Sequence, residues 1–75
     1  MVISLEELSK IFSSAFEVEI VLDMDSSKEN MGEWDSLKHL HLILELEDTL
    51  NIEFTPFEIE QMTSVVQILT ILKEK

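Results

Sequence analysis

The chain has 75 residues, of which 16 are acidic and 5 are basic, so its formal net charge is −11 at neutral pH. This charge excludes nucleic-acid backbones and anionic membranes as partners, because their phosphates would repel it; it favours basic protein surfaces, with solubility alone as the alternative explanation. The absence of cysteine excludes disulfides and cysteine-based zinc sites, and a single Gly and a single Pro favour helices over a turn-rich β fold.

The first predicted helix begins at Ser4. Ser4-Leu5-Glu6-Glu7 fits a capping box, in which the serine and the glutamate each accept a bond from a backbone N–H. Apolar residues then recur at helical spacing, at Leu5, Leu8, Ile11, Phe12 and Ala15. The segment 16–20 alternates apolar and acidic residues, as a strand does. Because a single strand would have no pairing partner, we interpret it as the helix end running into a loop.

A polar loop, 23–35, precedes the strongest helical pattern, which runs from Ser36 to about Leu50. At roughly 100° per residue, the core face of this helix holds Leu42, Ile43, Leu46 and Leu50. A second apolar stripe holds Leu37, Leu40 and Leu44, and the polar side holds Lys38, His41, Glu45 and Asp48. Either a neighbouring short helix covers the second stripe, or the stripe is a partly exposed docking surface.

Two further helices follow. Thr55-Pro56-Phe57-Glu58 offers an N-cap, a proline at the first helical position and a capping-box glutamate, for a short helix ending near Gln61. Thr63 or Ser64 caps the last helix. The predicted fold is all-α: one domain, 1–75, forming a small four-helix bundle with a long loop between helices one and two and a short third helix.

The position of the chain in the cell follows from what the sequence lacks. No apolar run reaches the roughly 18 residues of a membrane span. The first residues lack the basic and apolar regions of a signal peptide. We therefore expect a cytoplasmic monomer without a membrane span.

Ser36 stands where the polar loop meets the long helix, and its position has two interpretations. A serine there is normally an N-cap, whose oxygen accepts a bond from a first-turn N–H. The same place suits a phosphate, because free N–H groups and the positive end of the helix dipole meet there. The residue alone favours the cap over a hydroxyl that carries a phosphodiester.

Three other kinds of site fit poorly. Asp23-Met24-Asp25 begins like an EF-hand, but Lys28 and Trp34 stand where that loop needs Gly and Glu. His39 and His41 are two apart on one helix, so they point apart and do not share a metal. Ser36 and His39 can approach each other, but no nucleophile elbow surrounds the serine. His39 lies on the core side of the helix. The favoured interpretation is a partly buried histidine whose nitrogens are hydrogen-bonded, and the less favoured one is a contact with cargo next to Ser36.

The chain resembles the acyl carrier proteins, the phosphopantetheine-dependent carrier family. Asp35-Ser36-Leu37 matches the D-S-L attachment motif of that family, and Thr63-Ser64-Val65 matches the opening of its last helix. The leucine-rich segment 40–48 and Asn51-Ile52-Glu53-Phe54 lie between them. The likeness extends over essentially the whole chain, including its length, helix order and acidity.

This resemblance implies that Ser36 carries 4′-phosphopantetheine, supplied by coenzyme A, with Asp35 and Leu37 completing the attachment motif. The chain is then a carrier without catalytic activity of its own and without a metal. It would hold acyl groups as thioesters and shuttle them between enzymes: a phosphopantetheinyl transferase, an acyl-loading ligase or transferase, and downstream acyl-processing enzymes. The alternatives are an aminoacyl or peptidyl carrier, and a carrier-like interaction module without a prosthetic group.

The resemblance also suggests which residues meet partners. We expect partner contacts at Trp34, Lys38, Leu40, His41, Leu44, Glu45, Glu47 and Asp48. Lys38 and His41 stand where fatty-acid carriers commonly have acids, and Trp34 stands where small or aliphatic residues are usual. These departures favour a specialised lipid or secondary-metabolite pathway, with Lys38 and His41 rejecting generic partners. For an aliphatic cargo, Leu42, Ile43, Leu46 and Phe54 are the candidate groove, although the core also needs them.

Overall fold

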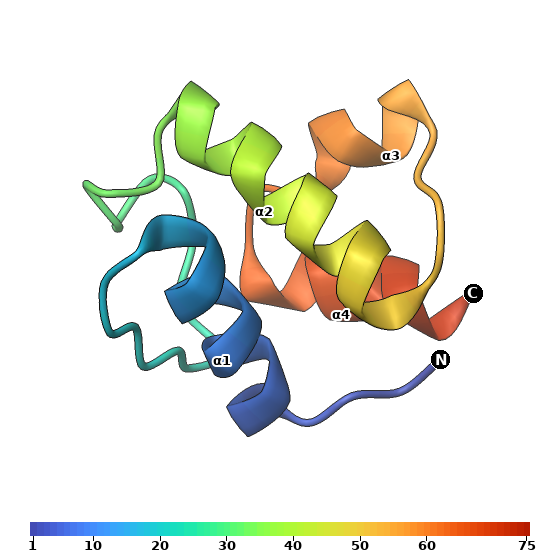
Figure 1. Ribbon diagram of the computed structural model, residues 1–75, viewed down its shortest axis with the longest axis horizontal. Helices are drawn as coiled ribbons and strands as arrows, with labels where there is room; N and C mark the ends of the chain where they lie inside the picture. The colour runs from blue at the N-terminus through green and yellow to red at the C-terminus, as the bar shows by residue number, and fades with distance from the viewer.

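The computed structural model describes residues 1–75 and confirms the all-α fold. Its four helices are α1 (Leu5–Phe16), α2 (Ser36–Leu50), α3 (Pro56–Gln61) and α4 (Val65–Lys73). In Figure 1, α2 runs diagonally across the molecule, with α1 against its lower left side, α4 behind its second half and α3 at its upper right. No helix is long and apolar enough to cross a membrane.

Side chains set the helix starts where the sequence predicts them. The Ser4 hydroxyl accepts the Glu7 N–H at 3.0 Å, and the Ser64 hydroxyl accepts the Gln67 N–H at 3.2 Å. At α3, Thr55 and Glu58 form both bonds of a capping box. The box predicted at Ser4 has only its serine half. Because capping residues act on the backbone within one turn, the sequence predicts the starts of these three helices correctly.

The segment after α1 is fastened to that helix by serine hydroxyls. Ser13 Oγ accepts the Ile20 N–H at 2.8 Å, and Ser9 Oγ accepts the Leu22 N–H at 3.0 Å. Ser9 and Ser13 are four residues apart on the helix, a rise of about 6 Å, and Ile20 and Leu22 are two residues apart in an extended segment, which spans nearly the same length. Both hydroxyls can therefore reach a backbone N–H of the segment. Ile20 and Leu22 are buried. The alternating pattern thus belongs to a loop packed on a helix, as the sequence predicts.

The long loop is joined to the start of α4. The Lys28 N–H donates to the Thr63 carbonyl at 2.8 Å, and the Val65 N–H donates to the Ser26 carbonyl at 3.0 Å. These two bonds form an isolated antiparallel bridge between Ser27 and Ser64. They hold the loop in place ahead of α2, so that the residues leading into α2 have a fixed path.

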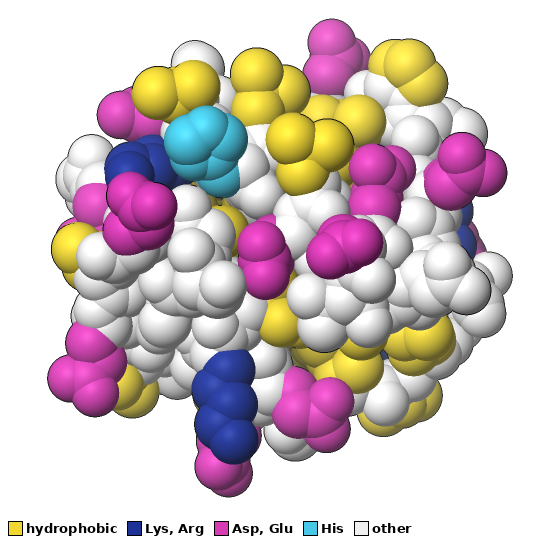
Figure 2. All heavy atoms as spheres, in the orientation of Figure 1, with side chains coloured by type: hydrophobic (Ala, Val, Ile, Leu, Met, Phe, Trp, Pro, Cys, Tyr) yellow, Lys and Arg dark blue, Asp and Glu magenta, His cyan; other side chains and the backbone are white.

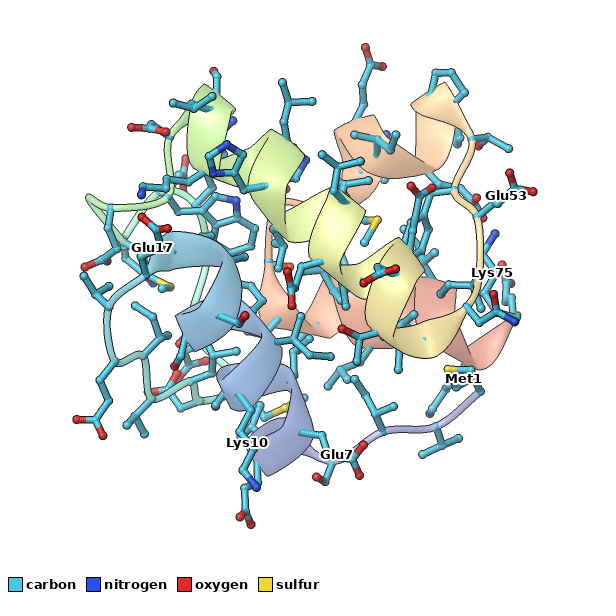
Figure 3. All side chains as sticks on the ribbon, in the orientation of Figure 1. Met1, Glu7, Lys10, Glu17, Glu53 and Lys75 are labelled. Carbon is cyan, nitrogen blue, oxygen red and sulfur yellow. The ribbon has the colours of Figure 1, made fainter.

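Glu58 gives α3 a pH-dependent attachment to Lys75, just after α4. Lys75, at the end of the chain in Figure 3, donates to Glu58 Oε1 at 2.7 Å. This bond, together with one from the Thr55 backbone N–H, holds the pKa of Glu58 below its usual value. The folded state therefore favours the carboxylate. Its contribution to stability is complete above the unfolded pKa of a glutamate and is lost as the pH falls through the lowered folded pKa.

We expect Glu58→Gln to lower the urea midpoint of unfolding at neutral pH. The difference from wild type should shrink as the solution is acidified below about pH 4, where wild type loses the same charge. Glu60→Gln, an exposed change on the same helix, is the matched control and should show no such convergence. A Glu58→Gln deficit that persists unchanged in acid would contradict this attachment.

Candidate functional site

Ser36 is the first residue of α2, and the capping role belongs to Asp35 instead. The Asp35 backbone is extended, and its Oδ1 accepts the Lys38 N–H at 2.9 Å. The prediction that Ser36 is the N-cap is therefore wrong by one residue, because the extended backbone of a cap residue is at Asp35 and Ser36 is already helical. The Ser36 side chain is exposed and is released from the capping role.

The start of α2 fits a phosphate on Ser36. The helix is 15 residues long, and its first turn contains no acidic residue. The N–H groups at its start and the helix dipole therefore favour negative charge there. Asp35, the nearest acid in the sequence, already directs one carboxylate oxygen to a backbone N–H. An exposed hydroxyl at this end can carry a bulky substituent that extends away from the protein surface into solvent.

Lys38 has an internal role that the sequence does not reveal. Its Nζ donates to the Phe16 carbonyl at the end of α1, at 3.2 Å. The last turn of α1 contains no basic residue of its own, so Lys38 supplies the cation that a helix C-terminus favours. Lys38 therefore links α2 to α1. This contact is additional to the expected role of its charge in rejecting generic partners, which stays a prediction.

Trp34 is a core residue, which corrects the expectation that it contacts partners. Its side chain is only 2% exposed. The indole ring meets the Phe12 ring edge-on, with centroids 5.0 Å apart, and lies 6.4 Å from that of Phe16. The large residue before Asp35-Ser36-Leu37 therefore anchors the end of the long loop in the core.

His39 is buried between Trp34 and α3, as the core-side interpretation predicts. It is 8% exposed, its Nδ1 accepts the Trp34 Nε1–H at 3.0 Å, and its Nε2 lies 2.9 Å from the Ile59 carbonyl oxygen. Indole N–H only donates and a carbonyl only accepts, so the ring is neutral with its hydrogen on Nε2. Both nitrogens are engaged, so His39 is not free to activate the Ser36 hydroxyl.

The second stripe of α2 is exposed. Leu37, Leu40 and Leu44 are 60%, 57% and 63% accessible, and we call these three residues the α2 apolar face. In Figure 2, hydrophobic side chains gather along the upper edge of the molecule, over α2 and α3. The alternative that a short helix covers this stripe is wrong, because α3 lies beside it. The docking-surface interpretation remains.

The polar residues of α2 divide into engaged and free ones. Glu45 Oε2 accepts the Ser14 hydroxyl at 3.1 Å, and Glu47 Oε2 accepts the Phe54 N–H at 3.0 Å. These two carboxylates therefore also hold neighbouring segments. His41 and Asp48 are exposed. Of the polar residues on this helix that we expect to meet partners, His41 and Asp48 are thus the most accessible.

The candidate groove for an aliphatic cargo is filled. Leu42 and Leu46 are completely buried, and Ile43 and Phe54 are nearly so. The three surface hollows lie elsewhere: between α1 and the segment 17–22, between α3 and α4, and between the long loop and α4. The core thus uses these side chains, as the sequence analysis allowed.

Comparison with known proteins identifies the family. No family model and no curated protein matches the chain. A solved structure does: the solution NMR structure of a holo acyl carrier protein from Geobacter metallireducens is 32% identical, with a TM-score of 0.83. The match covers 95% of this chain and 83% of that one. With its helix order, its exposed serine at the start of α2 and this likeness over nearly its full length, the chain belongs to the acyl carrier protein family.

Proposed function

We propose that this carrier protein holds its cargo on a 4′-phosphopantetheine arm attached through a phosphodiester to Ser36. The observation that supports the proposal most strongly is the exposed Ser36 hydroxyl at the start of a 15-residue helix, within Asp35-Ser36-Leu37 and freed from capping by Asp35. The solved relative is described as a holo carrier, which agrees with such an arm.

The residues around Ser36 prepare this site without taking part in chemistry. When bound, the arm supplies a thiol that holds an acyl group as a thioester. Asp35 fixes the first turn of α2, and Trp34 anchors the loop just before it. Ser36 therefore has a defined position but an unobstructed side chain. No side-chain nitrogen is placed to activate it, since His39 is engaged on both sides.

We further propose that partners dock on the α2 apolar face, next to Ser36. Leu37 and Leu40 follow the serine by one and four residues, and each of the three leucines of this face is more than half exposed. His41 and Asp48 lie on the same helix with exposed side chains and complete this surface. The transferase, the loading enzyme and the acyl-processing enzymes, in a fatty-acid, polyketide or related pathway, would meet this surface in turn.

Intact-mass measurement tests the attachment. The purified chain, incubated with coenzyme A and a phosphopantetheinyl transferase of broad specificity, should gain the mass of one arm. The carrier relative purified in its unmodified form serves as the positive control for each transferase. If several active transferases leave the chain unchanged, it is a carrier-like interaction module instead.

Placing a charge in the α2 apolar face should slow the transfer of the arm to Ser36. A glutamate at Leu40 or Leu44 would place a charge in a surface that loses water on docking. We expect kcat/KM for the transferase to fall about tenfold or more for each change, as at an interface hot spot. Val21→Glu adds the same charge at an exposed apolar residue outside α2 and should change little. Equal losses in all three variants would show that net charge, and not this face, is responsible.

A further inference from the structure

His39 joins three parts of the molecule beneath Ser36. We call the Trp34 Nε1–His39–Ile59 carbonyl chain the His39 bridge. His39 follows Ser36 by three residues, so it lies about one turn further along α2 on the same side. Trp34 ends the long loop, and Ile59 belongs to α3. The bridge therefore crosses the seam between α2 and α3 directly below the proposed attachment point.

The bridge is the hydrogen bond that ties α3 to α2. α3 has six residues, none of them fully buried, and its other side-chain tie, Glu58 to Lys75, leads to the end of the chain. A short helix without a buried residue separates from its neighbours more easily than the long helices do. Opening the seam must therefore break the His39 bridge as well as the packing of Ile59 and Met62 on the core.

A cargo that enters the interior beside α2 must part α2 from α3 or displace the core. The apolar residues on the core side of α2 are buried, and none of the surface hollows is lined by α2. Opening would leave the His39 N–H and the Ile59 carbonyl without partners in apolar surroundings, which is unfavourable. The free energy gained by burying the cargo must offset this loss. It grows with each buried methylene group, so a short or polar cargo cannot supply enough of it.

We infer that the His39 bridge is a specificity element: it keeps the seam between α2 and α3 closed, so that the carrier presents a short or polar acyl group in solvent. Trp34 and His39 act as one unit, since each satisfies the polar group of the other. The inference rests on the proposed attachment at Ser36, but the bridge itself can be tested on the unmodified chain.

The first experiment measures hydrogen exchange in the unmodified protein. His39→Leu keeps an apolar side chain of adequate size and removes both bonds; His39→Gln retains an N–H donor for Ile59. We expect the α3 amides and the Trp34 indole N–H to exchange about tenfold or more faster in His39→Leu, with α1 amides changed much less. His39→Gln should restore part of the α3 protection. Uniform acceleration in all helices would overturn the local role of the bridge.

The second experiment uses acetyl and octanoyl forms of the modified protein, after intact mass has confirmed the arm. In wild type, hydroxylamine should cleave both thioesters at similar rates, and both forms should melt at similar temperatures. In His39→Leu, the octanoyl form should be cleaved several-fold more slowly and melt higher. Octanoyl protection in wild type equal to that in His39→Leu, or absent from both, would overturn the inference. Failure to gain an arm counts against the proposed function alone.

Discussion

Replacing Ser36 with alanine should abolish addition of the arm while leaving the fold intact. The hydroxyl is the proposed attachment atom, so its removal leaves the transferase no acceptor. Ser36 is exposed and Asp35 provides the cap, so the free energy of unfolding should change by less than about 0.5 kcal/mol. Intact mass after incubation with coenzyme A and transferase, together with urea unfolding, measures both effects.

Two matched variants sharpen this result. Ser14→Ala removes another exposed helical hydroxyl and should be modified like wild type. Asp35→Ala removes the cap, should cost about 1 kcal/mol of stability, and should slow modification without preventing it. Modification of Ser36→Ala at the wild-type rate would place the attachment site elsewhere.

Trp34→Ala should be the most destabilising of the substitutions considered. It empties the space of the largest buried side chain, against Phe12, Phe16 and His39, and leaves His39 Nδ1 without its donor. The expected loss is about 3–5 kcal/mol of unfolding free energy, a large part of the total for a small domain. Urea denaturation followed by circular dichroism measures it.

Trp34→Phe is the control for the aromatic contacts. It keeps a ring near Phe12 but removes the N–H donor, and we expect an intermediate loss of about 1–3 kcal/mol. If Trp34→Ala costs less than about 1 kcal/mol, the indole is not the anchor of the long loop and the burial of Trp34 is unimportant to stability.

Local signals explain what the sequence predicts correctly. Ser4, Thr55 and Ser64 act on backbone groups within one turn, so they mark helix starts without knowledge of the tertiary fold. Likewise, the apolar spacing of α2 identifies its core face: Leu42, Ile43 and Leu46 are buried, and Leu50, predicted with them, is partly buried against the core. The D-S-L motif adds the family, which the solved relative confirms.

Tertiary contacts explain what the sequence does not reveal. Lys38 is directed to α1 by the Phe16 carbonyl, 22 residues earlier in the chain, and no spacing rule predicts that contact. Trp34 is buried because α1 supplies Phe12 and Phe16 around it. One signal was available: a buried tryptophan usually needs an acceptor for its N–H, and His39 lies five residues away. Trp34 and His39, on either side of Ser36 in the sequence, thus form one hydrogen-bonded pair.

The most direct test of the account is to locate the arm on the protein made in cells that contain a transferase of broad specificity. The purified chain would be digested, and its peptides fragmented in a mass spectrometer. We predict one arm per chain, on the peptide that contains Asp35-Ser36-Leu37, with the fragments assigning it to Ser36. An arm on any other residue, or a chain that remains unmodified beside a fully modified control carrier, would contradict the account.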